Sequence, residues 1–203
     1  MTLNIVFAGE NFSLAAADHR RTKIETGEFV DDVQKVARIN NHVMAAYSGI
    51  YISDQLGQMK GLAEGIITAI RRERGESLDC LGVEEITQMY SKAMRDAQLF
   101  GVNKNEMDVT FHFTGRLSRG GFAVGRVSKH EDFEPVVTLP GQCNGLAWSL
   151  SMADVSPSSW IIGRLASMTE LSRESVALLT QEMFPWVAAK DKYVSPTFNV
   201  ISL

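Results

Sequence analysis

Cysteine is scarce in this chain, which has only Cys80 and Cys143 among 203 residues. Two cysteines are too few for a disulfide scaffold, and their spacing matches no zinc-binding motif. Cys143 stands in the segment Gly141-Gln142-Cys143-Asn144-Gly145 with no histidine near it in sequence. We therefore expect a buried or loop thiol there rather than a nucleophile, and a reducing, cytoplasmic setting for the protein.

An excess of basic over acidic charge is also absent, and so are long apolar runs. Twenty Lys and Arg residues stand against 24 Asp and Glu, giving a formal net charge of −4 and a pI near 5.6. This balance argues against a nucleic-acid or anionic-membrane partner. No apolar stretch is long enough to span a bilayer, and Met1–Glu10 lacks the basic start of a secretory signal, so we expect neither. Length and composition fit one domain over residues 1–203.

Three common site motifs are absent. The sequence contains no GxxxxGK[ST], no GxGxxG opening a helix and no HExxH. The four histidines, His19, His42, His112 and His130, show no ligand spacing, and we expect each on the surface or on an edge strand. Neither a metal nor an organic cofactor is implied.

Hydrophobic periodicity predicts separate blocks of strands and helices. Strands are expected at Leu3–Phe7, Phe12–Asp18, Val36–Ile39, His42–Ser48, Asp108–Gly115, Gly121–Val127, Phe133–Leu139 and Thr197–Leu203. Helices are expected at Ile52–Arg74, Val83–Phe100, Leu146–Met152, Ser159–Met168 and from Ser172 to about Trp186, the last with no complete capping box. Such segregated blocks favour an α+β fold, most economically a four-layer αββα sandwich.

Position 2 carries a threonine, directly after the initiator methionine. A small residue there favours removal of Met1, which leaves a free amine on Thr2. An α-amino group with a reference pKa of about 7.7–8.0 can take the proton of the neighbouring hydroxyl and so activate it as a nucleophile. A threonine at this position is common, so it gains meaning only from its context.

Five blocks in order supply that context. They are Ala15-Ala16-Ala17-Asp18-His19-Arg20-Arg21-Thr22, Val33-Gln34-Lys35-Val36-Ala37-Arg38-Ile39, Ala45-Ala46-Tyr47-Ser48-Gly49, Lys190-Asp191-Lys192-Tyr193 and Phe198-Asn199-Val200. Together they resemble, over nearly the whole chain, the proteasome β-subunits and the related bacterial HslV-type peptidases, which are N-terminal-nucleophile (Ntn) hydrolases. The resemblance implies the αββα Ntn fold, a catalytic group of Thr2, Asp18, Lys35, Gly49, Arg20 and Asp191, and a specificity pocket lined by Tyr47 and Tyr51.

Elementary chemistry agrees with these roles. A lysine beside the Thr2 amine and hydroxyl lowers the proton affinity of both, and a buried Lys35 needs a partner such as Asp18. Arg20 is expected to brace Asp18, and the Gly49 N–H to face a developing oxyanion. Plainer interpretations stay open: Asp18 and Arg20 as an ordinary ion pair, Lys35 as a surface lysine, Gly49 as a turn glycine and the tyrosines as packing residues.

The chain departs from the family at two serines that help to hold the amine. Gln142 is expected at the position of the first, and Val194 at the position of the second, with Ser195 one residue further on. The preferred hypothesis is nevertheless a threonine-type amide hydrolase, a peptidase acting on peptide or protein substrates. Another acyl transfer on the same fold (small-amide hydrolysis or peptide ligation) and a non-catalytic shell subunit remain as alternatives.

Assembly is expected to be a homo-oligomeric ring, with an ATPase partner left open. The two long helices carry Met59, Met89, Met94, Leu99 and Phe100, more apolar side chains than one layer beneath them would bury. The alternative is that all of these residues pack on the sheet.

Overall fold

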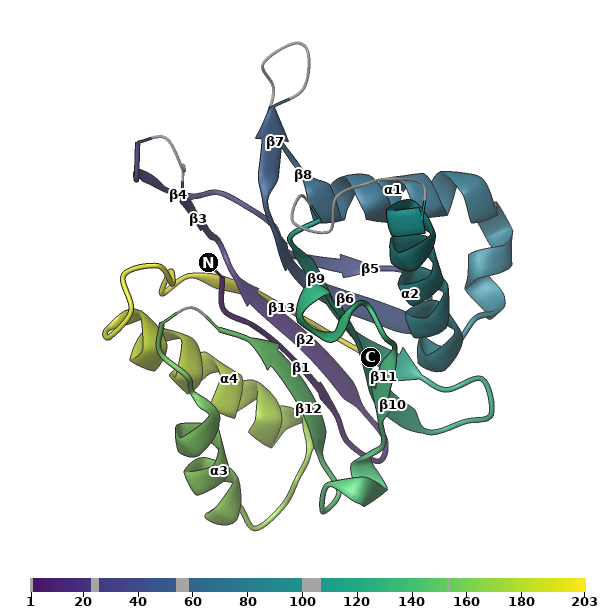
Figure 1. The fold of residues 1–203 in the computed structure, drawn as a ribbon. Helices are drawn as coiled ribbons and strands as arrows, with labels where there is room; N and C mark the ends of the chain where they lie inside the picture. The colour runs from purple at the N-terminus through teal and green to yellow at the C-terminus, as the bar shows by residue number, and fades with distance from the viewer. Residues whose placement is uncertain (1, 23–25, 54–58, 100–106, 153) are drawn as a thin grey trace.

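The structure is a computed structural model that describes residues 2–22, 26–53, 59–99, 107–152 and 154–203. Two antiparallel sheets lie face to face in its centre, and a pair of helices covers each outer side (Figure 1). The fold is thus the α+β sandwich of four layers that the segregated blocks of helices and strands predict.

The four-stranded sheet runs in the order β12-β1-β2-β13. Its strands are β1 (Asn4–Ala8), β2 (Ser13–Asp18), β12 (Ala147–Ser151) and β13 (Phe198–Ser202). The first hairpin pairs Asn4 with Ala17, and Asn4 is also the partner of Ser151 on the other side. Thr2 therefore leads into a strand in the interior of the sheet.

The five-stranded sheet runs in the order β11-β10-β9-β6-β5. Its strands are β5 (Val36–Arg38), β6 (Val43–Gly49), β9 (Val109–Arg116), β10 (Phe122–Ser128) and β11 (Val136–Thr138). Two short hairpins stand outside the two large sheets: β3 (Arg20–Thr22) with β4 (Phe29–Asp31), and β7 (Tyr51–Ser53) with β8 (Met59–Gly61).

Helices α1 (Leu62–Arg74) and α2 (Val83–Leu99) cover the five-stranded sheet, while α3 (Ser158–Ala166) and α4 (Arg173–Ala188) cover the other (Figure 1). Ser172 begins α4 with a complete capping box, because its hydroxyl accepts from Ser175 N–H and the Ser175 hydroxyl accepts from Ser172 N–H. The expectation of an incomplete box is therefore wrong. Among the described residues, none of the helices has the length and apolar content to cross a membrane.

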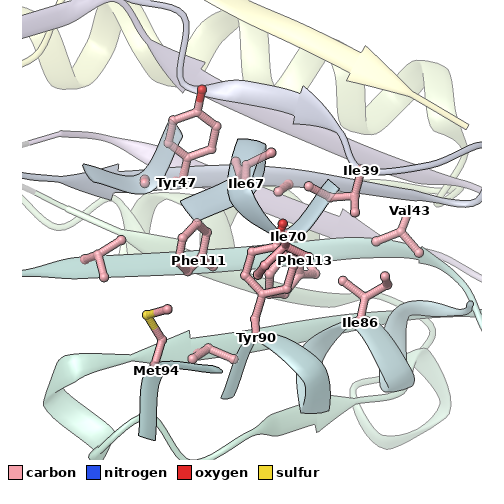
Figure 2. Packing of buried hydrophobic residues seen from close by; sticks show 14 of the residues in the cluster. Ile39, Val43, Tyr47, Ile67, Ile70, Ile86, Tyr90, Met94, Phe111 and Phe113 are labelled. Atoms are coloured by element: carbon pink, nitrogen blue, oxygen red, sulfur yellow. The ribbon is translucent and has the colours of Figure 1, made fainter. Parts of the chain in front are cut away.

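Three layers of buried apolar side chains hold the sandwich together. In the first, Tyr90 of α2 packs edge-on against Phe111 and Phe113 of β9, with centroid distances of 5.0 and 4.8 Å (Figure 2). In the second, Leu3, Ile5 and Phe7 face helices α3 and α4. The middle layer, between the sheets, contains the alanines Ala8, Ala15, Ala17, Ala46 and Ala147 beside larger residues such as Met44 and Phe122. Small side chains let the two sheets approach closely.

Two of the helices expected from the sequence are wrong in part or in whole. The segment Ile52–Arg74 begins as the β7–β8 hairpin, and its helix starts only at Leu62. The segment Leu146–Met152 contains strand β12, because Trp148 and Leu150 face the helices while Ser149 and Ser151 face the other sheet. The remaining predicted strands and helices are present, with shifts of a few residues at their ends.

Candidate active site

Thr2, Lys35 and Asp18 meet in a buried cluster at one end of the two sheets. The Lys35 ammonium donates to Thr2 Oγ1 at 2.9 Å and to Asp18 Oδ1 at 3.1 Å. It also donates to the backbone carbonyl of Arg20. Lys35 is 3% exposed and Asp18 is fully buried, so Lys35 is not a surface lysine. Because Thr2 precedes β1 and Lys35 precedes β5, this contact joins the two sheets.

Asp18 is held by backbone donors from three separate segments. Leu3 N–H donates to its Oδ1 at 3.1 Å, while Arg20 N–H and Ser195 N–H donate to its Oδ2 at 3.0 and 3.2 Å. Burial raises the pKa of the Asp18 carboxyl, an effect that Lys35 and the N–H groups of Ser195 and Arg20 oppose. Burial likewise lowers the pKa of the Lys35 ammonium, against the attraction of Asp18. The lysine can thus release a proton more readily than an exposed lysine.

The sequence predicts that Arg20 braces Asp18, but the Arg20 guanidinium does not pair with the Asp18 carboxylate. It forms a bidentate pair with Asp31 of β4, with Nε–Oδ1 and Nη2–Oδ2 distances of 2.7 and 2.6 Å. Its Nη1 donates to the carbonyls of Lys192 and Val194. The Ser195 hydroxyl donates to Asp31 at 3.2 Å. Arg20 therefore holds Asp18 directly through its backbone N–H, while its guanidinium acts indirectly, by fixing the segment that carries Ser195.

Gly49 is the last residue of β6 rather than part of a turn. The Tyr47 N–H donates to the Lys35 carbonyl, and the Ile50 N–H donates to the Asp108 carbonyl on the opposite side. Successive N–H groups alternate along a strand, so the Gly49 N–H points to the same side as that of Tyr47, the side of Lys35. A Cβ at Gly49 would lie 3.1 Å from the Asp108 carbonyl oxygen, which leaves little room for a side chain.

Tyr47 lines a cavity of about 10 Å³ together with Thr2, Lys35 and Gly49. Its ring is 6% exposed and lies 6.5 Å from that of Phe111, within the core under α1 and α2 (Figure 2). Its hydroxyl donates to the Gln34 carbonyl at 2.9 Å. Tyr47 is thus both a packing residue and a wall that nearly closes this cavity. Tyr51 begins β7, and its side chain lies outside the described residues.

A larger cleft, of about 570 Å³, opens from Thr2 and Gly49 toward β9, β10 and the end of β12. His112 of β9 lies on its floor and is 1% exposed, so the expectation of a surface or edge position is wrong for this histidine. Its Nδ1 is 2.8 Å from Ser149 Oγ and its Nε2 is 2.7 Å from Ser151 Oγ. Burial lowers the pKa of His112 to about 3, so the ring is neutral at physiological pH.

Asp191 is buried but its carboxylate serves the backbone. It accepts from the N–H groups of Asp154, Val155 and Tyr193, at 2.7, 3.0 and 2.9 Å. Among the contacts of the described residues, none joins this carboxylate to Thr2, Lys35 or Asp18. The structure thus places Asp191 behind the site, where it ties the segment after β12 to the segment before Ser195.

Gln142 lies at the wrong end of the sheet to stand for a serine near Thr2. Ala147 pairs with Ala8 and Ser151 with Asn4, so β12 runs from Gln142 toward Thr2. The Gln142 side chain accepts from Leu139 N–H instead. The hydroxyl nearest to Thr2 along β12 belongs to Ser151, which the sequence reasoning missed because it assigned this segment to a helix. Val194 is fully buried in the core under α3 and α4.

Neither cysteine contributes to the site, since Cys80 and Cys143 are both free and exposed. Within the described part of the chain, no three His, Cys, Asp or Glu side chains gather in a way that would hold a metal ion.

No protein-family model matches the chain, and no curated protein matches it in sequence. A solved structure is similar: an Anbu (Gly-1) mutant from Hyphomicrobium sp. strain MC1, with a TM-score of 0.70 and 12% sequence identity. The match covers 98% of this chain and 81% of that chain. At this identity the likeness concerns the fold alone, the α+β sandwich of four layers described above.

The burial of His112 generates a prediction about stability and pH. In the unfolded chain its pKa is near 6.5, whereas the folded protein holds it near 3. Between these values the unfolded state binds a proton that the folded state does not, so the free energy of unfolding falls as the pH falls. The slope from this group approaches about 1.4 kcal/mol per pH unit.

We expect His112→Asn to lose less stability than the wild type between pH 6.5 and 4.5, by about 2 kcal/mol. Urea denaturation at several pH values measures this difference. The exposed His130 is the matched control, and His130→Asn should follow the wild-type curve. Parallel curves for wild type and His112→Asn would show that burial does not keep this ring neutral.

Proposed function

We propose that the protein is a threonine-type amide hydrolase, a peptidase that uses Thr2 after removal of Met1. The observation that supports this most strongly is the contact of the Lys35 ammonium with Thr2 Oγ1 and Asp18 Oδ1 at the mouth of the 570 Å³ cleft. A hydroxyl beside a buried, hydrogen-bonded lysine is an arrangement suited to nucleophilic catalysis. The proteasome-like fold agrees with this chemistry.

In the proposed reaction the Thr2 hydroxyl attacks the carbonyl carbon of the scissile amide. Its proton passes to the Thr2 amine, directly or by way of Lys35 or water, and the carbonyl oxygen becomes an oxyanion that the Gly49 N–H stabilises. Collapse of this intermediate breaks the C–N bond, and the leaving amine takes up the proton. Water then hydrolyses the ester on Thr2 and regenerates the enzyme.

The residues around Asp18 act as positioning groups in this scheme. Asp18 holds Lys35, and the backbone donors at Leu3, Arg20 and Ser195 hold Asp18. A buried ammonium without such a partner would be strongly unfavourable. Asp31 and Asp191 fix the segments that provide these donors. A purely structural shell subunit has no need of a buried lysine at this place, which favours the enzyme over that alternative.

The two cavities beside Thr2 favour a substrate with a small side chain on one side of the scissile bond. Tyr47 leaves a cavity of only about 10 Å³, which is about the room that one water-sized group needs. The other side opens into the wide cleft. We therefore propose peptides with Gly, Ala or Ser at the narrow side as substrates.

Processing is the first requirement of this mechanism. Because the base is the amine of Thr2 itself, active protein should begin at Thr2. Intact-mass measurement of active and inactive fractions tests this, with the mass lower by one methionine in the active fraction. Full activity of a chain that keeps Met1 would contradict an N-terminal nucleophile.

The nucleophile is tested by Thr2→Ala, which should lower turnover of fluorogenic peptidyl aminocoumarin amides by roughly 10⁶-fold, as loss of a catalytic nucleophile does. Thr2→Ser is the matched control and should retain measurable turnover, because it keeps the hydroxyl and the amine. A β-lactone should label Thr2, as peptide mapping by mass spectrometry would show. Labelling of Cys143, or undiminished turnover in Thr2→Ala, would exclude Thr2 as nucleophile.

We also propose assembly into a homo-oligomeric ring, but through a different surface from the one the sequence suggested. Met94 is 5% exposed and Met89 packs partly buried on the core, while Met59, Leu99 and Phe100 lie outside the described side chains. Among the residues that the structure describes, the most exposed large apolar ones are instead Ile162 of α3 and Leu178 of α4, at 58% and 59%. Apolar side chains on neighbouring helices are typical of contact surfaces.

A change of Ile162 and Leu178 to glutamate should convert the oligomer to the 22.4 kDa monomer. Multi-angle light scattering on purified protein at micromolar concentration measures this. Changing the exposed Arg173 to glutamate is a control that alters charge on α4 without removing apolar surface, and it should leave the oligomer intact. A wild-type chain that is monomeric throughout would exclude the ring.

A further inference from the structure

The space between the two sheets changes character along its length. On the face of the five-stranded sheet that looks toward the other sheet, β6 presents Met44, Ala46 and then Ser48. On β10 the same face presents Phe122 and Val124, followed by Arg126 and Ser128. The apolar middle layer therefore gives way to polar side chains at the end where Thr2 lies.

The polar side chains stand in register across three strands. Ser48 pairs with Thr110, and Thr110 pairs with Ser128, so three hydroxyl groups form one row across β6, β9 and β10. Thr110 Oγ1 and Ser128 Oγ lie 3.2 Å apart. The next row places His112 beside Arg126. These five residues, Ser48, Thr110, His112, Arg126 and Ser128, form the polar floor of the cleft.

The opposite wall of the cleft holds this floor in place. Ser149 and Ser151 of β12 are both bonded to the neutral ring of His112, one at each nitrogen. A neutral imidazole has one donor and one acceptor nitrogen, so one serine accepts from the ring and the other donates to it. The ring is thereby fixed between the sheets, and Ser151 is held at the edge of the cleft, next to Asn4 and close to Thr2.

The hydroxyl row keeps hydrogen-bonding capacity beyond its internal contacts. Each hydroxyl has one donor and two acceptor positions, and the Thr110–Ser128 contact uses only part of them. Ser128 also accepts from His130 N–H at 3.2 Å. The remaining capacity faces an open cleft rather than packed protein. Polar groups with free capacity in a concave site are the usual means of orienting a ligand.

Charge on the floor is balanced. Arg126 forms a two-fold contact with Glu131, with an Nε–Oε2 distance of 2.8 Å, so neither charge is left without an opposite partner. An acidic or basic ligand side chain would have to compete with this pair. Asp108 is exposed and also lines the cleft, so it adds a carboxylate that disfavours an acidic ligand. Over the five floor residues themselves, a basic side chain would meet Arg126, so the floor favours an uncharged polar ligand, and its hydroxyl groups favour a polar ligand over an apolar one.

We propose that the polar floor is a substrate subsite that binds an extended peptide segment carrying Ser, Thr, Asn or Gln, on the side of the scissile bond away from Tyr47. This subsite rests on the proposed attack by Thr2, since Thr2 and Gly49 line both this cleft and the narrow cavity beside Tyr47. The protein then selects a small residue on one side of the cut and uncharged polar residues on the other.

The test uses an equimolar decapeptide library, with cleavage sites mapped by mass spectrometry. In the wild type, Ser, Thr, Asn and Gln should be enriched within three residues on one side of the cut, relative to Leu, Val, Asp and Lys. The double variant Thr110→Val with Ser128→Ala should reduce this enrichment about three- to tenfold, the effect expected from losing one or two hydrogen bonds. Thr138→Val on β11, outside the cleft, is the matched control and should keep the wild-type preference.

A second variant, Ser48→Ala, removes the third hydroxyl of the row. It provides an independent test of the subsite if the double variant does not fold. Cleavage without polar enrichment, or enrichment unchanged in both floor variants, would overturn the subsite while leaving Thr2 hydrolysis standing. If the wild type cleaves no peptide, hydrolysis fails, and binding decides the subsite. Thr2→Ala should then bind a fluorescein-labelled Ser/Thr/Asn heptapeptide more tightly than a Leu/Val one, and equal binding would overturn the proposal.

Discussion

The buried pair of Lys35 and Asp18 is the constraint on which the site depends. Taking an ammonium and a carboxylate out of water costs several kcal/mol for each ion, and only close geometry with further hydrogen bonds offsets this. Asp18 obtains those bonds from the backbone at Leu3, Arg20 and Ser195. The start of β1, the end of β2 and the segment before β13 must therefore meet at one point, and Thr2 is carried to Lys35 as part of that arrangement.

The site lies at an end of the sandwich where polar side chains gather between the two sheets. Further along, the middle layer is mostly apolar, with alanines beside Met44 and Phe122, and the buried Thr114 donates to the Phe7 carbonyl across it. At this end it becomes Thr2, Asn4 and Ser151 on one sheet, facing His112 and its neighbours on the other. The same alternation of side chains that builds the core thus also brings the reactive and polar groups to face one cleft.

Much of the fold, and the contact of Thr2, Asp18 and Lys35, could be predicted from the sequence, because the signals for them are local. Strand alternation and turn residues identified the hairpins, and five short blocks brought Thr2, Asp18 and Lys35 together. The partners of Arg20 could not be found in this way, since Asp31 lies in a three-residue strand too short to show a period. Strand β12 was missed although Trp148, Leu150 and the intervening serines alternate, because five residues also fit a helical face. That error hid Ser151 and left His112 without its partners, whereas the serine position at Gln142 was inferred separately, from the family resemblance.

The alanine layer between the sheets has a consequence for how this chain can diverge in evolution. The contact between Thr2 and Lys35 bridges the two sheets, so its length follows the distance between them. That distance is set by residues such as Ala15, Ala17 and Ala46, which touch no substrate. A larger side chain at any of these positions would push the sheets apart and so move Thr2 away from Lys35, without altering either residue. These small core positions therefore constrain the geometry of the site although they take no part in its chemistry.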